Sequence, residues 1–384
     1  MRRSEMRVLN WITALLLLAG AARAEFAADP LGQVEPLPER WPAHWVLVHD
    51  IAFEHIMDGK TVVLDLDAET PADQFKGMFN SAFAAFLAQS RTRPEIYLAE
   101  TYYSRGTRGE RTDVLTIYDK RSLSPTGEVV LKTNRAILLP QKFSMQMTSD
   151  DTLALIYNFT PAMSVSVVDP IAKRYVADIP IPGCAAVFPT GQRSFSSLCG
   201  NGTLYTVRLD ADGQPAGTSR SERFFDPESD ALIEKAAWHA GRAWFPSYHG
   251  RWQPVDFSGD APRIEPAWSM LDDETAGWRP GGLAPAAAGA DGRLYVLAHP
   301  EGREGSHRDP GVEVWVFDPS ARQRIARYPL RLPGLTLALT RDAELLLVIN
   351  VEMQLDVYRA SDGELLKTIA GIGTETPLLV FGAN

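Results

Sequence analysis

The sequence predicts an all-β chain built from repeated antiparallel units, and three observations support this. Apolar and polar residues alternate in short runs that end at an aspartate, as in residues 114–119 (VLTIYD), 164–169 (SVSVVD) and 313–318 (EVWVFD). Glycine and proline lie between these runs, which is typical of turns between short strands. The pattern returns with a mean spacing of about fifty residues, a period that marks a repeat architecture.

The repeat marks seven units, each long enough for four short strands. Four-stranded units of this period are typical of a β-propeller, in which every sheet is covered by its neighbours. We therefore expect a seven-bladed β-propeller. A β-sandwich is the alternative, although seven such units would overfill one. The expected units cover residues 45–67, 96–131, 152–181, 195–225, 241–270, 292–330 and 343–370.

Two stretches fall outside the repeat. The apolar segment at residues 377–380 (PLLV) follows the last unit, and we expect it to add a strand to the N-terminal sheet and close the ring. Residues 74–90 place four phenylalanines at helical spacing. A short amphipathic helix and a loop leading into a strand are equal alternatives for this stretch.

The N-terminus has the pattern of an export signal. Three arginines precede an apolar run at residues 8–19, and Ala22-Arg23-Ala24 resembles a cleavage site. We expect a signal peptide at residues 1–24, an extended proline-rich arm at 25–44 and the propeller domain at 45–384. Such a leader predicts a cleaved, exported protein, and an uncleaved lipid-facing anchor is the alternative. The arm could lie across a partner subunit.

The charge balance argues against polyanionic partners. The whole chain has a net charge of −10, and residues 1–24 carry four arginines and one glutamate. The remaining chain therefore carries about −13, which opposes binding to phosphate backbones and anionic lipid surfaces. Neither nucleic acid nor a membrane is an expected partner.

The chain has two cysteines, Cys184 and Cys199, which bracket a turn at residues 189–191. In an exported chain the two thiols are expected to form one disulfide between adjacent strands. A pair of buried free thiols is the alternative. Two cysteines without nearby histidines do not predict a zinc site.

The sequence contains no recognisable catalytic motif. It lacks a GxSxG elbow, an HExxH pair and a phosphate-binding GxxxxGK loop. The seven histidines are spread over different units. A metal-dependent lactonase would need His239, His249 and His299 to converge on the central channel, whereas separate structural roles are the simpler interpretation. We therefore expect no catalytic residue and no metal site in this chain.

Several segments in order resemble the large subunit of the quinoprotein amine dehydrogenases, the methylamine and aromatic amine dehydrogenases of the bacterial periplasm. The likeness runs from about Trp41 to Phe381, and DFSGD and HPEGREGSH favour the aromatic (aralkylamine) enzyme. The matching segments are GMFNSAF (77–83), TYYSRGTRGERTD (101–113), SVSVVD (164–169), the two cysteines, DFSGD (256–260), GWRPGG (277–282) and HPEGREGSH (299–307).

This resemblance implies a noncatalytic large subunit in a heterotetramer of two large and two small subunits. The cofactor of the family, tryptophan tryptophylquinone, lies on the small subunit together with the catalytic aspartate. The enzyme oxidises primary amines to aldehydes and ammonia and passes the electrons to a blue copper protein, azurin for the aromatic enzyme and amicyanin for the methylamine enzyme.

The same resemblance implies one site residue in this chain. In the family, the phenylalanine that closes the GMxxxxF pattern lies at the substrate channel beside the quinone, and this position is Phe83. The residues after it, AAFL, depart from the polar and proline residues expected there, which leaves the channel shape open. Ordinary core packing is the alternative role.

The leading hypothesis is thus the large subunit of an aromatic amine dehydrogenase. A methylamine dehydrogenase heavy chain is the alternative within the family. A lactonase-like hydrolase and a propeller that serves only as a protein-binding scaffold are the alternatives outside it.

Overall fold

The computed structural model describes residues 35–383 apart from 138, 140 and 374. The predicted signal peptide and residues 25–34 of the predicted arm lie outside the described residues. The regular secondary structure of the described chain is almost entirely antiparallel β-sheet, as predicted. Its helical segments are short: η1 (Phe53–Asp58), α2 (Pro71–Gln74), η2 (Lys142–Ser144), η3 (Asp273–Thr275) and η4 (Ser306–Arg308). No helix in this part of the chain is long and apolar enough to cross a membrane.

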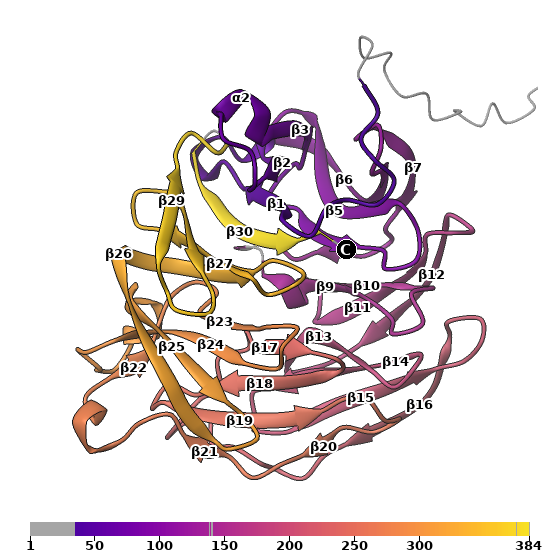
Figure 1. Ribbon diagram of the computed structural model, residues 1–384. Helices are drawn as coiled ribbons and strands as arrows, with labels where there is room; N and C mark the ends of the chain where they lie inside the picture. Colours follow the sequence, from indigo (N-terminus) through magenta and orange to yellow (C-terminus); the bar gives the residue numbers. More distant parts are fainter. Residues whose placement is uncertain (1–34, 138, 140, 374, 384) are drawn as a thin grey trace, which may run out of the picture. The chain divides into compact units, whose positions relative to one another are not determined.

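The strands form six hydrogen-bonded sheets, which follow one another in chain order (Figure 1). The first contains β1 (Trp45–Asp50), β2 (Lys60–Asp65), β3 (Phe75–Asn80) and β30 (Pro377–Gly382). The second contains β4 (Phe86–Gln89), β5 (Glu95–Arg105), β6 (Arg108–Asp119) and β7 (Pro125–Val130). The third contains β8 (Asn134–Arg135), β9 (Met145–Met147), β10 (Ala154–Thr160), β11 (Ser164–Asp169) and β12 (Arg174–Pro180).

The remaining three sheets hold the second half of the chain. The fourth contains β13 (Cys184–Thr190), β14 (Ser194–Cys199), β15 (Leu204–Leu209) and β16 (Pro215–Arg220). The fifth contains β17 (Ala237–His239), β18 (Arg242–Pro246), β19 (Arg251–Asp256), β20 (Arg263–Ile264) and β21 (Trp268–Ser269). The sixth contains β22 (Arg279–Pro280), β23 (Ala286–Ala288), β24 (Leu294–His299), β25 (Gly311–Asp318), β26 (Gln323–Leu339), β27 (Leu345–Asn350), β28 (Leu355–Arg359) and β29 (Leu365–Ile369).

The architecture is a β-propeller, but the prediction of seven separate blades was wrong for the sheets of the described chain. Five sheets have the four or five strands of one blade, and the sixth has eight strands. The difference arises at β26, which is continuous over 17 residues. Its first part pairs with β25 and its last part with β27, so no turn separates the two neighbouring units.

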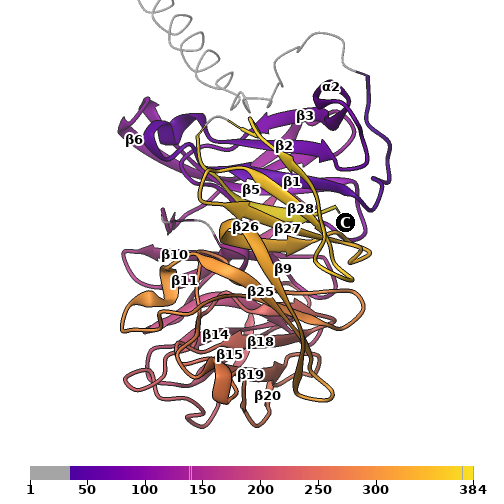
Figure 2. The same ribbon diagram turned by 60° about the vertical axis from the view of Figure 1, so that its left-hand side comes forward.

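The ring closes as the sequence predicted. β30, from the C-terminal end, pairs with β1, and Val48 lies opposite Val380. Both views show β30 beside the N-terminal strands (Figures 1 and 2). This pairing joins segments more than 300 residues apart and leaves β1 with a hydrogen-bonded neighbour on each side.

The core lies between neighbouring sheets. Successive side chains of a strand point to opposite faces, so Val46 and Val48 pack toward Leu347 and Ile349 on one side of the first sheet. Leu47, between them, packs instead with Leu87 and Leu98 of the second sheet. Every residue of β1 is therefore buried, which is why the strand alternates less clearly in sequence than a one-sided strand would.

The sequence missed the innermost strands. β4, β9, β17 and β23 have only three or four residues each, which is too few to show a period of two. In these sheets the expected units began one or two strands late, and the fourth unit also omitted β13, which has seven residues. The structure also decides between the alternatives for residues 74–90, because this stretch holds β3, a loop and β4, with a helical turn that ends at Gln74.

The described part of the predicted arm packs on the propeller. Trp41 is buried against Trp45, with 5.9 Å between the ring centroids, and Leu37 donates its backbone N–H to the carbonyl of Arg121 at 2.7 Å. Within residues 35–44, Trp41 is thus buried and Leu37 half-buried against this chain, whereas Pro36, Pro38 and Pro42 are exposed.

Candidate functional site

The candidate site is the loop that carries Phe83, residues 81–85, which we call the Phe83 loop. It connects β3, the outer strand of the first sheet, to β4, the inner strand of the second. The β1–β2 connection and the β5–β6 hairpin lie at the same end of these sheets, because Lys60 pairs with Asn80 and Phe86 with Ala99. We call this end of the propeller the Phe83 face.

The backbone of the loop adopts a conformation that its sequence does not predict. Phe83 and Ala84 have positive φ angles of 55° and 50°. Residues other than glycine rarely adopt this region of backbone conformation. Such a conformation persists only where its surroundings fix it.

The buried side chain of Arg135, at the end of β8, holds the loop in place. Its guanidinium donates to the carbonyls of Ala82, Phe83 and Ala84, at 3.4 Å to Ala82 and 3.2 Å to Ala84. A planar guanidinium carries five N–H donors in a fixed arrangement, so one side chain can hold three successive carbonyls. Burial lowers the pKa of Arg135 to about 10, and the side chain stays charged at neutral pH.

Two buried carboxylates lie in the same region. Glu100 accepts the backbone N–H of Ala82 at 3.0 Å and the hydroxyl of Thr116. Burial raises the pKa of Glu100, and the hydrogen bonds that it accepts oppose this shift. Asp113 accepts the backbone N–H of Arg135 at 3.1 Å. The negative charges of Glu100 and Asp113 thus balance the positive charge of Arg135 near the loop, as buried charges require.

A buried histidine completes the support of the loop. His49 accepts the hydroxyl of Thr61 at Nδ1 (2.9 Å), and its Nε2–H donates to the carbonyl of Ala85 (2.9 Å). Burial lowers the pKa of His49 to about 4, so the ring is neutral at neutral pH, and the nitrogen that does not donate to the carbonyl of Ala85 accepts. Phe83 donates its N–H to the carbonyl of Ile56 at 2.7 Å. The buried side chains of Arg135 and His49, together with the β1–β2 connection, therefore hold the loop in place.

The Phe83 ring itself is 7% exposed and packs on Tyr103, with 5.2 Å between the ring centroids. Phe83 does not belong to the large hydrophobic clusters between the sheets of the described chain. Two segments beside the loop carry large apolar side chains that are exposed in this chain. These are Phe53 and Met57 in the β1–β2 connection and Tyr102 in β5.

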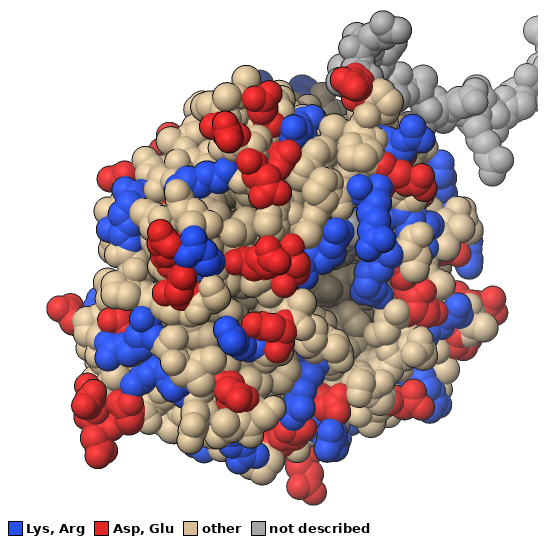
Figure 3. Space-filling view, in the orientation of Figure 1, with Lys and Arg blue, Asp and Glu red and all other residues tan. Residues whose placement is uncertain are grey.

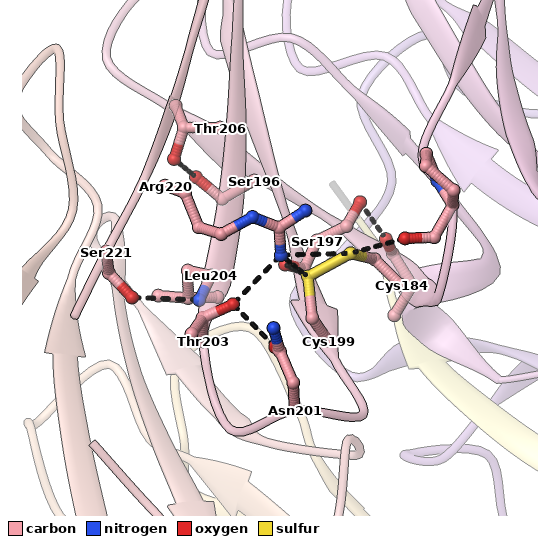
Figure 4. The surroundings of a disulfide bond; sticks show 12 residues. Cys184, Ser196, Ser197, Cys199, Asn201, Thr203, Leu204, Thr206, Arg220 and Ser221 are labelled. Carbon is pink, nitrogen blue, oxygen red and sulfur yellow. Dashed lines mark hydrogen bonds between the residues drawn. A yellow bond between two sulfur atoms is a disulfide. The ribbon is translucent and has the colours of Figure 1, made fainter. Parts of the chain in front are cut away.

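The two cysteines form the predicted disulfide. Cys184 and Cys199 lie opposite each other on β13 and β14, with a Cα–Cα distance of 3.9 Å. Figure 4 shows Arg220 of β16 reaching across the bridge. Its Nη1 lies 3.2 Å from the sulfur of Cys199 and 3.0 Å from the hydroxyl of Thr203.

Two of the segments that suggested the family resemblance contact each other. In the GWRPGG segment, Gly282 donates its N–H to the carbonyl of His307 at 3.1 Å. A Cβ on Gly281 would lie 2.7 Å from the ring of His299, so only glycine fits there. The histidine-containing segment, which joins β24 to β25, is thus packed against the rest of the sixth sheet.

The three histidines considered for a lactonase have separate surroundings. His299 is buried, and its Nε2 lies 3.0 Å from the carbonyl of Ser306. His239 ends β17, whereas His249 lies in the turn between β18 and β19. Among the described residues these three do not form a group of metal ligands.

A separate basic hollow lies at the opposite end of β4 from the Phe83 loop. It is lined by Arg91 and Arg93, which follow β4, together with Arg40, Lys120 and Arg341. Lysine and arginine side chains gather beside a hollow in the surface in Figure 3. Burial lowers the pKa of Lys120 to about 8. This hollow is polar and lies apart from the aromatic pair at Phe83.

The sequence pointed to Phe83 but missed the groups that hold its loop. Arg135, Glu100 and His49 are buried polar residues on strands of three different hairpins, and no local pattern connects them. A charged residue within an otherwise apolar strand, such as Glu100 in IYLAETYY, was the available signal.

Comparison with known proteins identifies the family. The family model described as methylamine dehydrogenase heavy chain (MADH) matches residues 42–382. The chain belongs to this family. The family resemblance found in the sequence is thereby confirmed.

Curated relatives carry the same name. The methylamine dehydrogenase heavy chain of Methylorubrum extorquens is 28% identical over 64% of this chain and 61% of its own length. That of Methylophilus methylotrophus is 27% identical over 75% and 72%, and that of Paracoccus versutus is 26% identical over 86% and 76%. The match to the first of these therefore spans less than two thirds of that protein.

Solved structures support the fold alone. A protein of unknown function from Desulfotomaculum acetoxidans superimposes with a TM-score of 0.56 at 13% identity, over 89% of this chain and all of that one. The β-propeller domain of Cps50 (Swd1) from Myceliophteria thermophila superimposes with a TM-score of 0.55 at 10% identity, over 86% and 97%. A dihydro-heme d1 dehydrogenase superimposes with a TM-score of 0.53 at 16% identity, over 91% and 77%.

Proposed function

We propose that this chain is the large subunit of a periplasmic amine dehydrogenase whose tryptophan tryptophylquinone lies on a separate small subunit, with two copies of each in the assembly. The observation that carries the proposal is the Phe83 loop in a member of this family: an aromatic side chain on a rigidly held loop, surrounded by exposed apolar residues. Apolar groups clustered around a fixed aromatic are typical of a surface that another protein covers.

In this proposal the chain contributes side chains that line the substrate channel, and it contributes no proton-transfer group. The quinone would supply the electron-accepting carbonyl for amine oxidation. Phe83 and Tyr103 would exclude water from the substrate channel and limit its width. Arg135 and His49, which hold the loop carbonyls, would keep that wall in place while substrates of different size enter.

The substrate class is the next part of the proposal. The DFSGD and HPEGREGSH segments favour an aromatic amine, with azurin as the electron acceptor. The names of the curated relatives favour methylamine, for which amicyanin would be the acceptor. We propose the aromatic enzyme and keep the methylamine enzyme as the second candidate.

We also propose that the eight-stranded sheet acts as two blades, so that the propeller has seven. β26 changes partner near Gly334, which pairs with Gly311 on one side and Asn350 on the other. With β26 divided at that point, five strands lie on one side and four on the other, which would match the size of the other sheets.

Purification from the periplasm tests the main proposal. We expect the chain to co-purify with a small subunit that carries a covalent quinone absorption band, and the complex to oxidise tyramine faster than methylamine. Faster turnover of methylamine would move the assignment to the second candidate. A chain that purifies without such a subunit, or that oxidises amines alone, would overturn the proposal and favour a scaffold role.

A further inference from the structure

A second cluster of side chains lies at the other end of the first sheet, where the start of the propeller meets its last turns. His44 precedes β1, Asp67 follows β2, and Asp342 and Glu344 belong to the turn between β26 and β27. The His44 Nδ1 lies 2.6 Å from Asp67 Oδ1. Its Nε2 lies 3.1 Å from Asp342 Oδ2 and 3.5 Å from Glu344 Oε2.

The Nε2 atom is the unexplained feature of this cluster. It is buried and makes no hydrogen bond, although two carboxylate oxygens lie within 3.5 Å of it. Both oxygens lie at ion-pair distance from this nitrogen when the ring is protonated. A buried ring nitrogen without a hydrogen bond is costly, unless another group binds its lone pair.

The distances suit a metal ion. Zinc binds histidine nitrogen and carboxylate oxygen at about 2.0–2.2 Å in a tetrahedron, so two ligand atoms should lie about 3.3 Å apart. The separations of 3.1 and 3.5 Å bracket that value. The nitrogen and the two carboxylate oxygens all lie within 4.8 Å of one another.

The surroundings orient each ligand atom. A carboxylate on the far nitrogen of a metal-binding histidine, here Asp67, fixes the tautomer and leaves Nε2 free to bind. The Oδ1 atom of Asp342 accepts the hydroxyl of Thr340 at 2.7 Å and the N–H of Glu344 at 3.1 Å. These bonds turn the other oxygen, Oδ2, toward His44. The carbonyl of His44 accepts the N–H of Leu66 at 3.1 Å.

We propose that His44, Asp342 and Glu344 form a binding site for a divalent transition-metal ion such as Zn²⁺, with Asp67 orienting the histidine. One imidazole and two carboxylates leave a fourth position for water. The ligands come from segments almost 300 residues apart, so the ion would tie the first strands of the propeller to the turn of its last strands.

The test uses untagged protein freed of metal with a chelator, because a histidine tag would bind zinc itself. We expect calorimetry to show one zinc ion per chain and zinc to raise the Tm by several degrees, since a ligand that binds only the folded state stabilises it. We expect calcium, which prefers oxygen ligands, to bind more weakly than zinc.

Three variants locate the site. His44→Ala and Asp342→Asn should each weaken zinc binding at least tenfold and remove the increase in Tm that zinc causes. Because Asp342 is partly exposed, its replacement still tests the site if His44→Ala proves unstable. His55→Ala is the matched control, because His55 pairs with a single carboxylate, Glu375, and zinc binding should be unchanged.

Two outcomes would overturn the assignment. The first is a wild-type chain that shows no saturable zinc binding and no change in Tm, as expected if His44 carries only a proton between the carboxylates. The second is zinc binding that persists in both His44→Ala and Asp342→Asn.

Discussion

The Phe83 loop and the disulfide-linked hairpin of β13 and β14 are held in different ways. The hairpin has regular strand geometry along most of its length and adds a covalent bond between two residues that already face each other. The Phe83 loop has no strand partner of its own. It depends on buried charged and polar side chains that bind its carbonyls one by one.

This difference indicates how each region responds when a stabilising residue is replaced. A disulfide acts mainly by limiting the unfolded chain, so its loss leaves the native contacts of the hairpin in place. Removing one member of a buried charged network leaves the other members without partners in the native state. We therefore expect the Phe83 loop to be the more sensitive region.

The largest effect is expected for Arg135→Met. The change leaves three loop carbonyls without their donor and removes the buried cation near Glu100, whereas Asp113 keeps its ion pair with Arg111. The expected cost is about 3–5 kcal/mol in the free energy of unfolding. Denaturant unfolding measures this loss. Arg208→Met, which removes an exposed guanidinium bound to one carbonyl at 3.3 Å, is the control and should have little effect. Equal losses in the two variants would contradict the assigned role of Arg135.

A pH dependence should follow from His49. The pKa of His49 is about 4 in the folded chain and 6.5 in the unfolded one, so below pH 6.5 the unfolded state binds a proton that the folded state does not. Stability should therefore fall as the pH drops from 6.5 to 4, by about 3 kcal/mol in total from this group.

The comparison of two variants isolates this contribution. His49→Gln should flatten the pH dependence of unfolding between pH 6.5 and 4, whereas replacing the exposed His249 with Gln should not. An unchanged slope in His49→Gln would show that other groups cause the acid sensitivity.

The disulfide should contribute slightly less than Arg135. Cys184→Ala should lower the free energy of unfolding by about 3 kcal/mol, the value expected for a loop of this length. The double variant with Cys199→Ala should lose no more than the single one, and reduced wild-type protein should match both. A loss well above that of Arg135→Met would reverse the comparison between the two regions.

The smallest effect on stability is expected for Phe83→Ala, which should act on selectivity. If Phe83 walls the substrate channel, the ratio of tyramine to methylamine turnover by the complex should change about tenfold. Phe79→Ala is the matched control, because Phe79 packs in the core against Tyr118 and should cost about 3–5 kcal/mol without changing that ratio. The opposite pattern would assign Phe83 to the core.

The sequence alone determined the parts of this protein that depend on local pattern. Alternating strands, the turns that begin at aspartates such as Asp119 and Asp169, and the strand that closes the ring all follow from periods of two and from turn residues. The cysteine pair was also predictable, because both residues lie in one hairpin.

The tertiary structure decided what depends on distant partners. Whether the expected units 292–330 and 343–370 form separate sheets depends on β25 and β27, which pair with one continuous strand between them. The positive φ of Phe83 depends on Arg135, and the surroundings of the His44 Nε2 atom depend on Asp342 and Glu344, which lie almost 300 residues away. Local propensity carries no information about such contacts, because they exist only once the ring has closed.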